Sequence, residues 1–269
     1  MLAAGAALMV LLVVAFLLRE AWPVLSGGDW LRFFADEGWY PIEGRFGLLP
    51  MVWATLAAAL GAVLLAAPLG LASAIFERFY APPAIATLYR AMLALLAGIP
   101  SVVYGLWGLT VLVPLIARWH PPGSSLLTAI LILALMILPT VALTSASALA
   151  AVPEAWLRGA AAMGLTRKGV IVGVAVPAAR GGILGGILLA TARALGETMA
   201  VLMVAGNVVQ IPTGLFEPVR MLTANMALEM AYATGTHRAG LFASGLMLTL
   251  LVLALAWFAA RIAGSTRHV

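Results

Sequence analysis

Two oppositely charged side chains stand inside one long apolar stretch of this sequence. Residues 181–204 read GGILGGILLATARALGETMAVLMV, about the length of one membrane-spanning helix, and carry Arg193 and Glu197. A charge at the centre of a bilayer costs roughly 2.5–3.5 kcal/mol, so neither side chain is expected to face lipid unpaired. On a helix the i,i+4 spacing puts both on one face. The pair is therefore either a buried structural ion pair or part of a path for a charged solute.

Other reactive chemistry is scarce in the chain. There is no cysteine, which excludes disulfides, thiolate ligands and thiolate nucleophiles. The three histidines, His120, His237 and His268, lie far apart, and none stands in an HExxH-like arrangement. We therefore predict no metal site and no catalytic residues.

The composition is that of a polytopic membrane protein. Of the 269 residues, 64% are hydrophobic and only 9% are charged, whereas soluble domains carry about 25% charged residues. The net charge of +5 is attributed to membrane topology rather than to a partner, and no nucleic-acid binding is expected.

Apolar runs predict six membrane spans, at residues 1–18, 51–75, 88–113, 126–150, 181–204 and 240–260. Between the first two, an aromatic-rich segment is expected to lie outside, with its rings at headgroup depth. Residues 219–232 predict a short helix that does not span. Basic residues gather in the loop 77–90, in residues 152–180 and in the tail, which places these parts and both termini in the cytoplasm.

The third predicted span contains the string LLAGIPSVVYGLWGL, which predicts a broken helix. Pro100 lacks an N–H and frees a carbonyl one turn back, and Ser101 is expected to compensate locally. Broken helices persist at membrane depth only inside protein or against water. The break is therefore either a packing kink or a substrate-facing bend, at which Ser101 and free N–H groups meet an anion.

Residues 152–177 carry a second pattern. Pro153 and Glu154 predict a helix start, Gly164 predicts its stop, and a second helix is expected up to Pro177. The segment resembles the cytoplasmic coupling motif of ABC-importer permeases, written EAA, three residues, Gly, nine residues and I-x-L-P. The matching residues are Ala160, Gly164, Val174, Val176 and Pro177. Arg158 replaces the motif's glutamate and Gly159 its first alanine, so an acid-mediated contact with an ATPase would be lost or redistributed.

The strings GIPSVVYGLWGL, from Gly98, and RALGETMAVLMVAGN, from Arg193, resemble the phosphate-transport permeases of the PstC type. This resemblance implies an all-α protein of six transmembrane helices with the type I ABC importer permease fold. It implies a single permease domain over residues 1–269, with a core at roughly 46–264 and the coupling segment at 152–177.

The same resemblance implies partners and a location. They are a second homologous permease in a heterodimer, a cytoplasmic ATPase dimer and a periplasmic phosphate-binding protein, all at the cell inner membrane. This chain would bind no cofactor and would be no enzyme, because ATP is used by the ATPase subunits. It has no GxxxxGK[ST] loop of its own.

Two sets of residues are the resulting site candidates. For the substrate pathway they are Arg193, Glu197, Ser101 and Tyr104; for ATPase coupling they are Arg158, Ala160, Gly164, Arg167 and Pro177. Other functions stay open at this point. They are a permease for another oxyanion such as molybdate or sulfate, an intramembrane enzyme acting on a lipid phosphate, and a sensor or scaffold in phosphate signalling.

Overall fold

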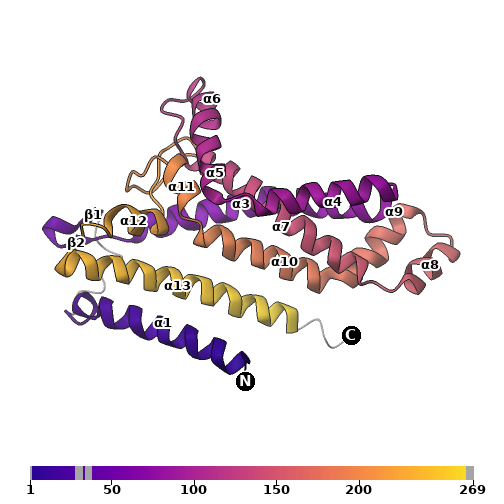
Figure 1. The fold of residues 1–269 in the computed structure, drawn as a ribbon, viewed down its shortest axis with the longest axis horizontal. Helices are drawn as coiled ribbons and strands as arrows, with labels where there is room; N and C mark the ends of the chain where they lie inside the picture. The colour runs from indigo at the N-terminus through magenta and orange to yellow at the C-terminus, as the bar shows by residue number, and fades with distance from the viewer. Residues whose placement is uncertain (1, 28–32, 34–37, 265–269) are drawn as a thin grey trace.

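A computed structural model describes residues 2–27, 33 and 38–264 of the chain. Within these residues the regular secondary structure is helical apart from one short hairpin (Figure 1). In chain order the elements are α1 (Leu2–Leu25), β1 (Trp39–Tyr40), the 3₁₀ turn η1 (Pro41–Glu43), β2 (Arg45–Phe46), α3 (Leu49–Ile75), the π-helical turn η2 (Phe76–Tyr80), α4 (Pro83–Gly98), α5 (Ser101–Trp107), the π-helical turn η3 (Gly108–Leu112), α6 (Val113–Ala117), α7 (Leu126–Ala150), α8 (Glu154–Ala162), α9 (Arg167–Val170), the π-helical turn η4 (Ile171–Ala175), α10 (Val176–Gly196), α11 (Met199–Val204), α12 (Leu222–Glu229) and α13 (Gly235–Gly264).

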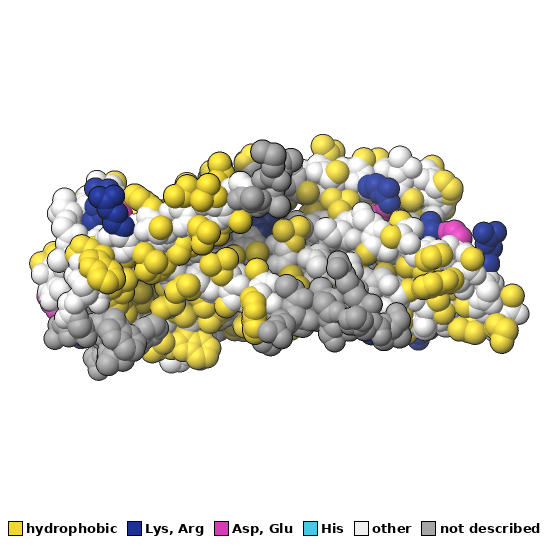
Figure 2. Space-filling model, turned by 90° about the horizontal axis from the view of Figure 1, so that it is seen from below, with side chains coloured by type: hydrophobic (Ala, Val, Ile, Leu, Met, Phe, Trp, Pro, Cys, Tyr) yellow, Lys and Arg dark blue, Asp and Glu magenta, His cyan; other side chains and the backbone are white. Residues whose placement is uncertain are grey.

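The long helices form one elongated bundle. Helix α7 packs against α3, α4 and α10, α10 contacts α13, and α13 pairs with α1. Figure 1 shows α8 and α9 at one end of the bundle and β1, β2 and α12 at the other. Hydrophobic side chains cover much of the bundle's outer face, and Lys and Arg gather mainly near its two ends (Figure 2). A surface of this kind suits a lipid environment along the bundle and water at its ends.

The membrane-spanning class is confirmed. In the part of the chain that the structure describes, five helical segments are long and apolar enough to cross a bilayer: Ala7–Leu25, Leu49–Tyr80, Leu126–Ala150, Arg167–Gly196 and Gly235–Trp257. The pair Pro83–Gly98 and Ser101–Ala117 meets the same criterion jointly, with a bend of 89° between its halves. Counted as one span, this bent pair makes six.

The predicted break in the third span is confirmed, at Ile99 and Pro100, which both have extended backbone angles. The proline ring disfavours helical geometry at the residue before it, and α4 therefore ends at Gly98. The buried Tyr104 hydroxyl donates to the carbonyl oxygen of Leu96 at 2.8 Å and satisfies one carbonyl of the last α4 turn. The predicted compensation by Ser101 is wrong, because its side chain makes no hydrogen bond within the described residues.

The fifth span is shifted from its predicted position. A continuous helix over 181–204 is wrong: the span runs over Arg167–Gly196, and the backbone is extended at Glu197 before α11 begins. A helix ending at Pro177 is also wrong. The π-helical turn η4 shifts the hydrogen-bond register just before this proline, so the chain continues through it as a helix.

The segment after α1 packs into the protein. The rings of Phe33, Trp39 and Phe46 are only 4%, 6% and 8% exposed and pack with Leu48 and Leu241. The prediction of rings at headgroup depth is therefore wrong for these three residues, because helices α3 and α13 bury them. The short helix predicted between 219 and 232 is confirmed as α12.

Close packing of α10 on α7 generates the first prediction. A Cβ built on Gly186 would lie 2.0 Å from Thr144 Oγ1, whereas a Cβ on the neighbouring Gly185 meets nothing within 4 Å. Gly186→Ala should therefore lower the free energy of unfolding by about 1–3 kcal/mol through overpacking. Gly185→Ala should raise it by about 0.5–1 kcal/mol, the usual gain for alanine in a helix. Thermal unfolding of the two purified variants in detergent measures the difference, and equal stability would contradict this packing.

Candidate functional site

Arg193 lies in the last turn of α10, at a helix end rather than in mid-helix. Its neighbours Ala190 and Ala194 belong to the main apolar core of the bundle. Its Nη1 atom donates a hydrogen bond of 3.3 Å to Thr140 Oγ1 on α7. The C-terminal end of a helix carries partial negative charge, which favours a cation at this position. The arginine is thus stabilised inside the bundle by a helix end and a hydroxyl group.

Glu197 directly follows α10, and its side chain contacts the start of the next helix, α11. Its Oε1 atom accepts from the backbone N–H of Ala200 at 3.1 Å, and its own carbonyl accepts from Thr223 Oγ1 at 2.7 Å. A carboxylate is favourable at a helix N-terminus, here that of α11. The predicted i,i+4 geometry is therefore wrong. The helix ends at Gly196, and among the described residues Arg193 and Glu197 form no ion pair.

Helix α5 carries two of the predicted pathway residues, Ser101 and Tyr104. It packs closely on α11, since a Cβ on Gly105 would lie 2.9 Å from the Ala200 Cα. Tyr104 on α5 is buried in the same core cluster as Ala190 and Ala194, the neighbours of Arg193. Ser101 stands at the start of the same short helix, half-buried. The structure therefore places Tyr104 in the core cluster that borders Arg193, whereas the Glu197 side chain is directed to α11.

Thr140 is a site residue that sequence reasoning missed. It follows Pro139 inside the apolar helix α7, and a proline–threonine pair at that position is the signal that was available. The two helix breaks, at Ile99–Pro100 and at Glu197, are linked by the packing of α5 on α11 (Figure 1). Backbone that leaves helical geometry within a membrane is tolerated inside protein or beside a water-filled cavity. Arg193 lies in the last turn of α10, directly before the break at Glu197.

The predicted coupling segment has the expected helix–turn–helix form. Helix α8 buries Leu157, and its Trp156 is 58% exposed. Gly164 has φ +85°, a left-handed conformation that L side chains rarely adopt, and no neighbour within 4 Å of a built Cβ. The sequence candidates here lie at the surface: Arg158, Gly164, Arg167 and Pro177 are exposed and Ala160 is half-buried. The segment therefore presents an accessible face at one end of the bundle.

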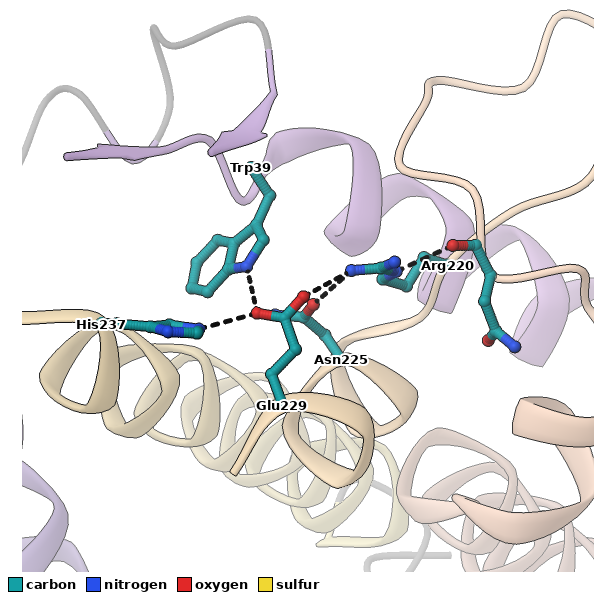
Figure 3. A network of polar contacts seen from close by, with 6 residues as sticks. Trp39, Arg220, Asn225, Glu229 and His237 are labelled. Carbon is teal, nitrogen blue, oxygen red and sulfur yellow. Dashed lines mark hydrogen bonds and ion pairs between the residues drawn. The ribbon is translucent and has the colours of Figure 1, made fainter. Parts of the chain in front are cut away.

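A polar network at the opposite end is centred on Glu229 in α12 (Figure 3). Its Oε2 atom accepts from Trp39 Nε1 at 2.7 Å and lies 2.8 Å from His237 Nε2. Its Oε1 atom forms an ion pair of 2.8 Å with Arg220. The carboxylate thus joins the β1 strand, the loop before α12 and the start of α13.

Arg220 extends the network to the α11–α12 loop (Figure 3). Its Nε donates to the carbonyl oxygen of Asn207 at 2.9 Å, and its Nη1 donates to Asn225 Oδ1 at 3.1 Å. Asn207 has φ +58° and donates from Nδ2 to the Leu202 carbonyl oxygen at 2.7 Å. The network fixes the loop that leads from the paired helix break.

Within the described residues, no group of His, Asp and Glu side chains is arranged to hold a metal ion.

The bundle, with five spanning helices and one bent pair among its described residues, defines the class of this protein as a polytopic membrane protein. The family of binding-protein-dependent transport system inner membrane components matches residues 66–268. The chain belongs to this family, and its sequence is of the PstC type.

Curated relatives and solved structures agree on this class. The phosphate transport system permease protein PstC of Mesorhizobium japonicum is 37% identical, over 91% of this chain and 82% of the relative. The probable ABC transporter permease protein YqgH of Bacillus subtilis is 39% identical, over 78% and 70%. Inward-facing structures of the MetNI methionine ABC transporter match with a TM-score of 0.65 and 19% identity, over 81% of this chain and 95% of theirs. The type I importer permease fold is thereby confirmed.

The Glu229 network generates a stability prediction. Glu229→Ala leaves Arg220 without its counter-ion and Trp39 Nε1 without an acceptor, and it should lower the free energy of unfolding by ~2–4 kcal/mol. The control is Glu43→Ala. Glu43 and its partner Arg45 are exposed and 3.9 Å apart, so this change should cost at most about 1 kcal/mol. Thermal unfolding in detergent compares the two variants, and equal losses would show that the network does not hold this end of the bundle together.

Proposed function

We propose that the chain is the membrane-spanning permease subunit of an ATP-driven phosphate importer and forms half of its translocation path. Several relatives carry the name phosphate transport system permease protein. The structural observation that carries the proposal is Arg193, which is held inside the bundle by Thr140 and has no carboxylate partner among the described residues. A cation in this setting is suited to an anionic solute.

The chemistry of arginine supports an oxyanion as the solute. A guanidinium presents N–H donors in a planar fork that matches phosphate oxygens, and Arg193 directs a hydrogen bond to Thr140 only, among the described residues. Glu197 lies four residues further on, but its carboxylate accepts from the Ala200 N–H at the start of α11 and forms no ion pair with Arg193. Its nearby negative charge still limits how tightly an anion is held, and a transport site must release what it binds. Ser101 and Tyr104 are the further pathway residues of this proposal.

The remaining parts of the importer are supplied by other subunits. A second homologous permease completes the path as a heterodimer, a cytoplasmic ATPase dimer binds the α8 end, and a periplasmic phosphate-binding protein delivers phosphate at the α12 end. This chain is no enzyme and binds no cofactor, because the ATPase subunits bind and hydrolyse ATP. Support comes from the outward-facing Trp156 and Met163 near α8, which are 58% and 83% exposed, and from the exposed apolar side chains Val103, Leu106 and Leu109 on the arm that follows the bend.

The subunit lies in the cell inner membrane, with the α8 end and both termini in the cytoplasm. The beginning of α1 and the end of α13 both point toward the side of α8 in Figure 1. The chain's only lysine, Lys168, and the neighbouring Arg167 are also at this end, as expected for a cytoplasmic face. The whole of residues 1–269 acts as one permease domain.

Coupling runs along one helical segment. ATP-driven closure of the ATPase moves α8 and α9, and the segment from Arg167 to Gly196 is helical throughout. This segment begins beside the docking face and ends with Arg193 in its last turn. Movement of α8 therefore reaches the guanidinium as a rigid-body displacement of the bundle.

Replacement of Arg193 tests the pathway role. Arg193→Gln removes the positive charge of a half-buried side chain and should lower phosphate uptake by about 100-fold or more, because the loss of a charged hydrogen bond to an anion costs about 2–5 kcal/mol. Arg193→Lys keeps the charge without the planar fork and should retain part of the activity. Uptake of labelled phosphate by the complete complex in vesicles measures both variants.

The matched control is Arg180→Gln, an exposed position on the same helix, which should transport normally. Normal uptake by Arg193→Gln in a complex that assembles would remove the pathway role. Competition of wild-type uptake by arsenate, sulfate and molybdate identifies the oxyanion. If molybdate or sulfate competes more strongly than arsenate, that oxyanion rather than phosphate is the substrate.

The left-handed turn between α8 and α9 generates a coupling prediction. Gly164→Val forces a β-branched residue into φ +85° and costs about 1–3 kcal/mol locally, enough to change the angle between the two helices. We expect ATP hydrolysis to continue while phosphate uptake falls by about tenfold. The control is Gly44→Val, which forces the same kind of strain at φ +70° in the hairpin at the opposite end of the bundle, where a built Cβ meets nothing within 4 Å. Unchanged uptake per ATP in Gly164→Val would contradict the role of this turn.

A further inference from the structure

The α8–α9 segment is attached to the end of α3 as well as to α10. Glu154, the first residue of α8, forms an ion pair with Arg78. Arg167, the first residue of α9, stacks over the ring of Tyr80 at 4.4 Å from its centroid. Arg78 and Tyr80 both belong to η2, the π-helical turn that follows α3. These four residues are called the clasp.

The same turn is tied to α4. The Glu77 side chain is only 3% exposed, and its Oε1 atom accepts from Arg90 Nε at 2.7 Å and lies 2.6 Å from Arg90 Nη2. Residues of one turn thus contact α4, α8 and α9. Within the described residues, Glu77 Oε2 and Arg78 Nε are buried and have no partner. π-helical turns such as η2 occur frequently at functional sites.

An apolar contact holds α8 against this turn. Leu157 of α8 is buried with Leu149 and Val170, and Phe79 of η2 packs against the same cluster. The ion pair, the ring stack and the apolar contact together restrain α8 relative to the end of α3. A displacement of α8 therefore carries η2 with it.

From η2 the chain leads to the other side of the pathway. Helix α4 begins three residues after η2, ends at the 89° bend and is followed by α5, which carries Tyr104. Tyr104 donates to the Leu96 carbonyl oxygen across this bend and is buried in the same core cluster as Ala190 and Ala194, which flank Arg193 on α10. Movement passed through η2 arrives at Tyr104, while movement passed through α10 arrives at Arg193.

We propose that Arg78 and Tyr80 are positioning residues that transmit the displacement of α8 and α9 to α3 and α4, by a route separate from the covalent route through α10. The inference rests on the proposed function, because it takes α8 as the point at which an ATPase acts. The acidic residue of α8 in this chain is Glu154, which is paired with Arg78 of η2.

Charge reversal tests the clasp in the reconstituted complex. The quantity measured is solute taken up per ATP hydrolysed, for Arg78→Glu, Glu154→Arg and the double variant. Each single reversal should lower this ratio by about tenfold, within the range of typical coupling energies between sites. The double variant restores an ion pair and should recover to within about twofold of wild type. Because both side chains are partly exposed, thermal stability should change little.

Matched variants separate transmission from a general effect of charge. Tyr80→Phe keeps the ring under Arg167 and should retain the wild-type ratio, whereas Tyr80→Leu should lower it. Arg45→Glu reverses an exposed charge near the opposite end of the bundle and should leave the ratio unchanged. Wild-type ratios in both single reversals, or a double variant as impaired as either single one, would overturn the proposal.

A second measurement distinguishes a failure of the clasp from a failure of the proposed phosphate transport. Stimulation of ATP hydrolysis by the external solute-binding protein also crosses the permease from end to end and requires no phosphate uptake. The single reversals should reduce this stimulation and the double variant should restore it. Absence of phosphate uptake by the wild-type complex would contradict the proposed function, whereas normal stimulation in the single reversals would contradict the clasp.

Discussion

The structure depends on how two charges are stabilised inside an apolar bundle. Arg193 and Glu197 are close in sequence, yet each is compensated by a helix end and a local hydrogen bond rather than by the other. A direct ion pair would have neutralised the guanidinium. Its placement at the C-terminal end of α10, beside Thr140, stabilises the cation and leaves it available to an anion.

This arrangement requires the backbone to leave helical geometry, and the fold places the two breaks together. Helix α5 begins after the break at Ile99 and Pro100 and packs on α11, which begins after the break at Glu197. The Glu229 network holds the loop that follows α11 at one end of the bundle, and the clasp holds α8 and α9 at the other. The site between them thus has a rigid attachment on each side, which suits a permease that moves as rigid bodies.

Sequence reasoning recovered the features that depend on local chemistry. Hydrophobic runs predict the spans, proline predicts the break at Pro100, and glycine predicts the turn at Gly164. The features that it missed depend on distant contacts. The end of α10 is set partly by Thr223, which bonds the Glu197 carbonyl, and Glu229 is joined to Trp39 across 190 residues. No local sequence pattern predicts contacts between such distant residues, so from sequence alone the charged side chains of the loops are interpreted only as solvated groups.

The central claim is that Arg193 borders a water-filled solute route, and the accessibility of Thr140 tests it most directly. The chain has no cysteine, so Thr140→Cys introduces a single thiol beside the guanidinium. In the assembled complex this thiol should react with a charged, water-soluble thiol reagent, and phosphate should slow the reaction. Leu64→Cys, on the apolar outer face of α3, should stay unreactive. A Thr140→Cys thiol that is as unreactive as Leu64→Cys, with and without ATP, would contradict the account.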